Sequence, residues 1–370
     1  MTAEIAILNR NAVALAADSA VTIGEGKIYN SVDKLFQLSI KSPIGLMIFG
    51  HPNCLGVPME VLIREFRHQT AATEFETVEQ CAGAFLEYLQ NGANYPKRLE
   101  LEGAQALVRV FLDELKDEIE TDFVEAIFNG AGSEVANAVR AEAALRVVAE
   151  RIAELEKKPD DPAFVDVDVQ RLVELHWEQF RSLFHFVSEP SPELLERYRY
   201  LIVLRIRKVF SSDHAVGLVF AGFGRDEIFP HLVHLEVEAR AFGHLKSRRV
   251  DTACLDMNSS DVDARIAAFA QQEVVETFLS GMIPDIDRLF RANMSKSVAV
   301  LSDIFTGREL LGGLTLSTAA KTHVDAMLGD VVKNFEDELT AIQRRYRAQV
   351  EGMVRFMPKG ELAHLAEALV

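Results

Sequence analysis

The chain has 370 residues, of which 49% are hydrophobic and 26% charged, and its formal net charge at pH 7 is −17. This length predicts two structural regions, and the composition is that of a folded globular protein rather than a disordered or fibrous one. The acidic charge argues against nucleic acid as a partner, because binding to phosphates requires a basic face.

The three cysteines are odd in number and far apart, which indicates a reducing compartment without a disulfide framework. The N-terminus has no signal-peptide pattern, and no run of 18 apolar residues occurs, so we expect a cytoplasmic protein that does not span a membrane. His231 and His234 are three residues apart in a predicted strand and so face opposite sides. With no zinc spacing and no Gly-Lys-Ser/Thr loop, we expect neither a metal nor a cofactor.

The first 50 residues have strand patterns. Glu4–Leu8 and Ala12–Ala17 flank Asn9–Asn11, a polar turn, and predict a hairpin. Both faces of this hairpin are apolar or small, which predicts a sheet that is covered on both sides. A second pair of strands is predicted at Lys34–Ile40 and Ile44–Phe49.

Helical spacing follows at 55–68 and 77–91, with Thr77 as the N-cap of the second segment. Residues 96–213 are helical in pattern almost throughout, with breaks that contain proline or glycine. The aromatic-rich stretch Trp177–Phe186 lies in this block. We expect it to pack in a helical core rather than to bind a cofactor.

Strand patterns return at 215–223. Residues 233–238 alternate apolar and polar side chains, which predicts a half-exposed strand. A strand at Ala264–Ala270 leads directly into a helix. The remainder is predicted to be helical, with a long segment at 317–355 and a last helix that starts at Pro358.

This order of elements predicts an α+β protein in which two sheets stack and helices cover the outside. We expect residues 1–95 and 214–370 to form the two halves of one core. The all-helical block 96–213 is then a large insertion between the halves.

The hairpin also places the start of the chain. If Asn9–Asn11 is a three-residue loop, Leu8 faces Ala12, and in the same register Thr2 faces Asp18. This register predicts a carboxylate beside the second residue of the chain.

Thr2 directly follows Met1, and a small residue there allows removal of the initiator. The exposed α-amino group has an ordinary pKa of about 7.7 to 8.0, so part of it is a free base near neutral pH. It can accept the proton of the threonine hydroxyl, which then attacks a carbonyl and forms an acyl-enzyme. A nearby lysine would lower the pKa of the amine and stabilise the alkoxide.

Several short stretches resemble the opening of the proteasome β subunit and of its bacterial peptidase relative. The aspartate follows the threonine by 16 residues and the lysine follows it by 32, as in that family. The stretches are Thr2, Ala16-Ala17-Asp18-Ser19, Thr22-x-Gly24, Val32-x-Lys34 and Gly45-Leu-Met-Ile-Phe-Gly50.

The resemblance implies an N-terminal nucleophile hydrolase with a four-layer αββα sandwich. It implies a peptide or protein substrate, a homo-oligomeric ring and an ATPase as a candidate partner. Thr2 would be both nucleophile and base, Lys34 would tune both, and Asp18 would pair with Lys34 and orient it.

The resemblance also assigns the oxyanion donor to the backbone N–H of Gly50, or of Phe49 beside it, and assigns Ser19 to hold the loop. Two departures stand out. Residues 265–271 lack the serine that the family carries before its third helix, and the chain ends at Val370 in a helical pattern without the closing strands.

Two hypotheses of different class follow. The first is a threonine-type peptidase or amidohydrolase that acts inside an oligomer. The second is a catalytically inactive, proteasome-like scaffold in which the helical insertion supplies a surface for a partner. Retention of Met1 would favour the second hypothesis, because it blocks the amine.

Overall fold

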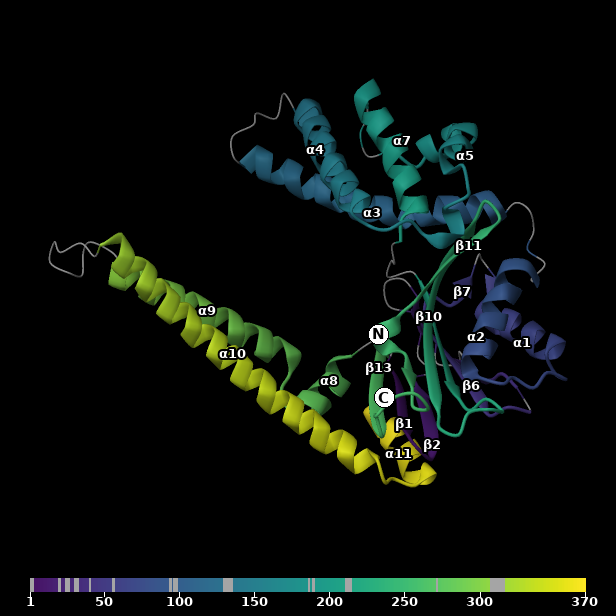
Figure 1. Cartoon of the computed structure of the whole chain (residues 1–370). Helices are drawn as coiled ribbons and strands as arrows, with labels where there is room; N and C mark the ends of the chain where they lie inside the picture. The colour runs from purple at the N-terminus through teal and green to yellow at the C-terminus, as the bar shows by residue number, and fades with distance from the viewer. Residues whose placement is uncertain are drawn as a thin grey trace. The chain divides into compact units, whose positions relative to one another are not determined.

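The structure is a computed structural model of the whole chain (Figure 1). It describes residues 3–18, 21–23, 27–29, 33–39, 41–54, 57–92, 95, 99–128, 136–185, 187, 190–209, 215–270, 272–306 and 317–370. Two compact units are present, the first made of Met1–Val32 with Met257–Val370 and the second of Asp33–Asp256. The chain is a mixed α+β protein with antiparallel sheets, as predicted.

The first unit contains a three-stranded antiparallel sheet with β1 in the middle. The strands are β1 (Ala3–Asn9), β2 (Ala12–Ala17) and β13 (Ala264–Ala270), in the order β13-β1-β2. One face of β1 presents Ile5 and Ile7, which pack in a common apolar core with Leu362 of the last helix. The predicted hairpin and the predicted strand at Ala264–Ala270 are confirmed.

Helices complete this unit in the residues that the structure describes. They are α8 (Glu273–Ser280), α9 (Pro284–Thr306), α10 (Thr318–Val354) and α11 (Lys359–Leu369). Helix α10 begins at the N-cap Ser317, whose side chain accepts a hydrogen bond from the backbone N–H of Ala320. Helix α11 begins after Pro358, and Leu362 and Leu369 are buried. The predicted long helix and final helix are therefore confirmed.

The hairpin register differs from the prediction by one residue. Leu8 pairs with Val13 and Asn9 with Ala12, so the turn has two residues rather than three. The physical reason is the side chain of Asn9. Its Oδ1 atom accepts hydrogen bonds from the backbone N–H of Asn11 and Ala12, at 2.9 and 3.0 Å, and so closes a tighter turn.

Asn9 is fully buried, and its side-chain nitrogen donates to the carbonyls of Val354 and Met357, at 3.0 and 2.8 Å. Asn9→Ala removes the turn bonds and the two bonds that tie the turn to the carbonyls of Val354 and Met357. We expect it to lower the free energy of unfolding by about 2–3 kcal/mol in urea denaturation. Asn11→Ala, at the exposed turn, is the control and should cost no more than about 0.5 kcal/mol. Equal effects of the two substitutions would contradict this role of Asn9.

The second unit contains a larger antiparallel sheet in the order β11-β10-β9-β6-β5, with β12 (Leu255–Asp256) paired to β10. Its strands are β5 (Leu35–Gln37), β6 (Ile44–Gly50), β9 (Val216–Gly222), β10 (His231–Ala241) and β11 (His244–Arg249). The helices α1 (Met59–Gln69) and α2 (Val78–Glu87) cover one face. There Phe85 touches Phe66 and Phe220 with ring centroids 5.0 and 5.7 Å apart.

A second core in this unit is helical and lies around α3 and α7. The helices are α3 (Leu99–Phe128), α4 (Ala136–Glu156), α5 (Val169–Leu175), α6 (Trp177–Arg181) and α7 (Pro192–Arg207). Phe180 and Phe184 are buried in this core, so the predicted packing role of the aromatic stretch is confirmed. The boundaries expected at 95/96 and 213/214 both lie within the second unit, and the status of 96–213 as an insertion stays a prediction.

Strand β10 is more buried than its alternating pattern predicted. His234 is 6% exposed and the side chain of Glu238 is 4% exposed, although both lie on the polar side of the pattern. The prediction of a half-exposed strand is therefore wrong for this part. Burial of the polar side is possible because α7 provides a charged partner for Glu238, Arg205.

Two short hairpins were not predicted. They are β3 (Val21–Ile23) with β4 (Lys27–Tyr29), and β7 (Asn53–Cys54) with β8 (Val57–Pro58). The second hairpin delays the start of α1 to Met59, later than the residue 55 that helical spacing indicated. Within the described part of the chain, every helix is too short or too polar to cross a membrane.

Candidate functional site

Asp18 directly follows β2, beside the first residue of β1. Its backbone N–H donates to the carbonyl of Ala3 at 2.9 Å. In the observed register Asp18 therefore faces Ala3, and the prediction that it faces Thr2 is wrong by one position because of the tighter turn at Asn9. Thr2 and Ser19, the other two predicted site residues in this region, lie outside the described residues.

Lys34 lies directly before β5 in the second unit and is 7% exposed. Its carbonyl accepts a hydrogen bond from the N–H of Ile48 on β6, at 2.9 Å. This bond continues the β5–β6 ladder and fixes the backbone of the lysine next to the strand that ends at Gly50. The structure therefore joins two predicted site residues, Lys34 and Gly50, through one pair of strands.

Gly50 ends β6 with a φ of +76°, in the left-handed region that favours glycine. A Cβ atom at this position would lie 2.3 Å from the carbonyl oxygen of Ala215, which is closer than any real contact. The chain therefore requires glycine here for both backbone conformation and space. The N–H of the next residue, His51, donates to the carbonyl of Ala215 at 3.3 Å, so the contact with the neighbouring strand continues past Gly50.

The two halves of the predicted site belong to different units. Asp18 lies in the first, while Lys34 and Gly50 lie in the second. The pairing of Asp18 with Lys34 stays a prediction. The strand that pairs with β1, Ala264–Ala270, contains no serine, so it has no side-chain hydroxyl to support the site.

A buried ionic cluster at the end of α7 was missed by the sequence reasoning. The guanidinium of Arg205 donates to both carboxylate oxygens of Glu238, at 3.1 and 3.2 Å, and the two side chains are 1% and 4% exposed. A fork of this kind is the strongest form of a charge-assisted hydrogen bond. The signal was weak in the sequence, because the partners come from a helix and a strand 33 residues apart.

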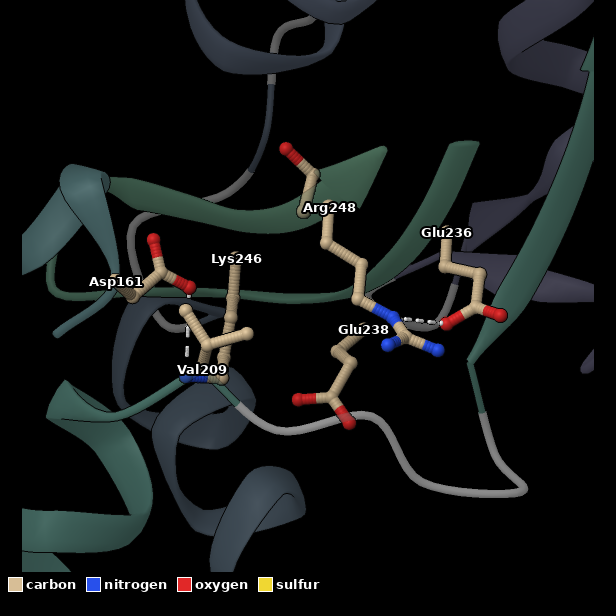
Figure 2. Close-up of a pocket in the computed structure, with 7 residues that line it drawn as sticks. Asp161, Val209, Glu236, Glu238, Lys246 and Arg248 are labelled. Atoms are coloured by element: carbon tan, nitrogen blue, oxygen red, sulfur yellow. Dashed lines mark hydrogen bonds and ion pairs between the residues drawn. The ribbon is translucent and has the colours of Figure 1, made fainter. Parts of the chain in front are cut away.

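Lys246 of β11 is the third member of this cluster (Figure 2). Its ammonium donates to the carbonyls of Ile206 and Lys208, at 2.9 and 2.6 Å, and lies 3.5 Å from the carboxylate of Asp161. Burial first, and then the charge of Arg205, lower the pKa of Lys246 to about 8.

The cavity beside Lys246 holds about 10 Å³, about the space of one water molecule. The lysine occupies the position of a C-terminal cap of α7, where a cation satisfies the last carbonyls of the helix. A cavity of this size leaves no room for a substrate, so we assign the cluster a structural role.

The ring of His231 is held by a carboxylate four residues before it. Nδ1 of His231 lies 2.9 Å from Oε1 of Glu227, and the other oxygen of Glu227 accepts from the N–H groups of Gly224 and Val78, at 2.7 and 3.1 Å. Glu227 thus closes the N-terminus of α2. In the part of the chain that the structure describes, no group of three or more His, Cys, Asp or Glu side chains could hold a metal ion.

Burial lowers the pKa of His234 to about 4, with a small opposing effect of Glu236 and a small added effect of Arg248. The unfolded chain takes up this proton near pH 6.5, whereas the folded chain resists it. We therefore expect the free energy of unfolding to be highest above pH 6.5 and to fall by up to about 3 kcal/mol as the pH decreases to 4.

Urea denaturation between pH 4 and 8 measures this slope. His234→Gln should flatten it, whereas His68→Gln, at an exposed position of α1, should leave it unchanged. An unchanged slope in His234→Gln would rule out this residue as its source.

The cysteines lack the properties of nucleophiles. Burial raises the pKa of Cys54 and of Cys81 to about 12, and it also raises the pKa of Cys254. The reactive form of cysteine is the thiolate, which a raised pKa suppresses at neutral pH. The sulfur of Cys254 instead accepts a hydrogen bond from the N–H of His234 at 3.3 Å.

Comparison with known proteins identified no relative of this chain. No family model, no curated protein and no solved structure matches the chain. Its function therefore has to be inferred from its own residues.

Proposed function

We propose that the protein is a threonine-type N-terminal nucleophile hydrolase that cleaves peptide or amide bonds. The observation that carries the proposal is the hairpin at the start of the chain. Its backbone hydrogen bond from Asp18 to Ala3, at 2.9 Å, places a carboxylate beside the residue that follows Thr2. A threonine at the end of a chain gains a nucleophile and a base in one residue once Met1 is removed.

Lys34 and Gly50 support the same chemistry. Lys34 directly precedes β5 and Gly50 ends β6, and Lys34 follows Thr2 by 32 residues, as in the proteasome-like family. The left-handed backbone of Gly50 suits an oxyanion donor, which is typically worth about 10²- to 10³-fold in rate.

The sheets support the four-layer sandwich as part of this proposal. The sheet β13-β1-β2 carries α11 on one face, and the sheet that contains β6 and β9 carries α1 and α2 on one face. Each sheet thus has helices on one side and a second face to cover. We propose that these second faces are the inner layers of an αββα sandwich.

In the proposed reaction, the α-amine of Thr2 accepts the proton of the Thr2 hydroxyl as its oxygen attacks the substrate carbonyl. The backbone N–H of Gly50 donates to the oxyanion that forms. The amine returns the proton to the leaving nitrogen, which gives an acyl-enzyme. Water, deprotonated by the same amine, then releases the acid and restores the hydroxyl. Lys34 stabilises the alkoxide, and Asp18 orients Lys34.

We extend the proposal to a ring of identical chains that encloses the sites, acts on unfolded peptide and works with an ATPase. The scaffold hypothesis stays the alternative, and the lack of a serine in Ala264–Ala270 favours it. The two differ in whether the amine of Thr2 becomes free.

The test is a mass measurement of the N-terminus of the natively expressed chain, before and after treatment with a peptide epoxyketone. The proposal expects loss of Met1 and one adduct on Thr2, because this reagent needs both the hydroxyl and the free amine. A retained Met1 without an adduct would support the scaffold.

A further inference from the structure

Helices α9 and α10 of the first unit form an antiparallel hairpin (Figure 1). Polar side chains contribute hydrogen bonds to the contact between the two helices. Gln343 of α10 donates to Asp287 of α9 at 3.3 Å, and Arg291 of α9 donates to Gln343 and Thr340 at 3.3 and 3.5 Å. Ser302 and Asp325 are hydrogen-bonded further along the hairpin.

Large apolar side chains lie on the outside of this hairpin. Ile286, Leu289 and Phe290 of α9 and Met327, Val331 and Ile342 of α10 are each between 50% and 63% exposed. The outer face of a helix in a monomer is typically polar, so large apolar side chains exposed to this degree are unusual there. Apolar side chains exposed to this extent therefore indicate a surface that binds a partner.

The exposed apolar residues of α9 and α10 share one face. The rings of Phe290 and Phe335 meet with their centroids 5.5 Å apart, which marks the side of the hairpin where they lie. Ile286 is one turn from Phe290 on α9, and Val331 and Ile342 follow the helical repeat of Phe335 on α10. We call the exposed apolar residues on this side the hairpin face.

The hairpin face is large. Six side chains of this size, each exposed to about half its area, present roughly 600 Å² of apolar surface, which is at the upper end of the about 300–600 Å² of the largest patch on a typical monomer. A stable interface buries about 800 Å² on each partner. Because only a little over half of such an interface is apolar, the hairpin face is wide enough for a specific complex.

Charge along α10 indicates what the partner is. Over residues 318–338 acidic residues outnumber basic ones by five to two, whereas over 339–355 four arginines stand against one glutamate. A second α10 in the antiparallel direction would place the acidic half of each helix along the basic half of the other. A parallel second copy would place like charges together.

We propose that a second copy of this chain docks on the hairpin face, with the two α10 helices antiparallel about a two-fold axis at Ile342. In this arrangement Ile342 meets its own copy and Val331 lies opposite Met353, which is 60% exposed. The two hairpins form a four-helix bundle, and the interface is the same patch on both copies, as in most dimers. The proposal is independent of the proposed hydrolase activity.

Sedimentation of the full chain over a range of concentrations tests the dimer. Val331→Glu with Ile342→Glu should raise the dimer Kd at least 100-fold while circular dichroism stays unchanged. Leu175→Glu, at a position 72% exposed on α5, is the matched control and should leave the Kd within twofold. A wild-type chain that stays monomeric at about 100 µM, or that binds lipid vesicles without dimerising, would overturn the proposal.

Charge reversal tests the antiparallel direction. Arg344→Glu with Arg345→Glu should weaken the dimer at least tenfold, and so should Asp337→Arg with Glu338→Arg. A mixture of these two variants should dimerise again, because each reversed segment then faces its opposite charge. Failure of the mixture to associate would exclude the antiparallel pair.

Cross-linking gives a second measure of direction. Ile342→Cys should form a disulfide between two copies, whereas two Val331→Cys residues should not, since they lie about 33 Å apart along antiparallel helices. The reverse result would show a parallel pair.

Discussion

Replacing Thr2 with alanine is expected to lower peptide hydrolysis at least about 10⁴-fold and to abolish the epoxyketone adduct, because alanine has no oxygen to form the acyl-enzyme. Alanine is small enough to allow removal of Met1, so the loss cannot come from a blocked N-terminus. The rate is measured on the full chain with a panel of fluorogenic peptides.

Thr2→Ser is the matched control, because it keeps a hydroxyl and a free amine. We expect it to form the adduct and to retain measurable hydrolysis. If the Thr2→Ala chain hydrolyses peptides as fast as the wild type, the activity belongs to another site or to a contaminant.

Glu238→Gln is expected to lower the free energy of unfolding by about 3–5 kcal/mol. The substitution removes the negative charge from a fork in which Arg205 is 1% exposed, and the guanidinium then stays buried without its counter-charge. Urea denaturation at pH 7 measures the loss. Glu236→Gln is the control, because its partner Arg248 is largely exposed, and it should cost no more than about 1 kcal/mol.

The double variant Arg205→Met with Glu238→Leu distinguishes the contribution of the charges to the free energy of unfolding from the contribution of packing. Removal of both charges leaves no buried ion without a partner, so most of the lost stability should return. A double variant that is less stable than Glu238→Gln would show that the pair is needed for its shape or for its place beside Lys246.

Local sequence signals were sufficient for many elements. Thr77 predicted the start of α2, and its hydroxyl indeed accepts from the N–H of Gln80 at 3.0 Å. Pro358 predicted the start of α11, and the strand pattern of Ala264–Ala270 predicted β13. These signals are reliable because caps and apolar periodicity act between residues that are close in the chain.

The register of the β1–β2 hairpin, in contrast, could not be predicted from local sequence signals. The turn signal at Asn9 was read correctly, but the residue joins β1 instead of the loop. Its side chain is bound to Val354 and Met357, about 345 residues away, and no local pattern reports on a contact of that length. The pairing of β1 with β2 is therefore shifted by one residue from the predicted register, so that Asp18 faces Ala3 instead of Thr2.

The candidate site also combines features that the sequence predicts with features that only long-range contacts determine. The order and spacing of Thr2, Asp18 and Lys34 are properties of the sequence alone, and they carry the hypothesis of an N-terminal nucleophile. Only the tertiary structure decided that Gly50 is held at a φ of +76° against the carbonyl of Ala215, because that contact joins two strands that are distant in the chain. It also decided the burial of Glu238, since the desolvation of a charge depends on which helix covers it.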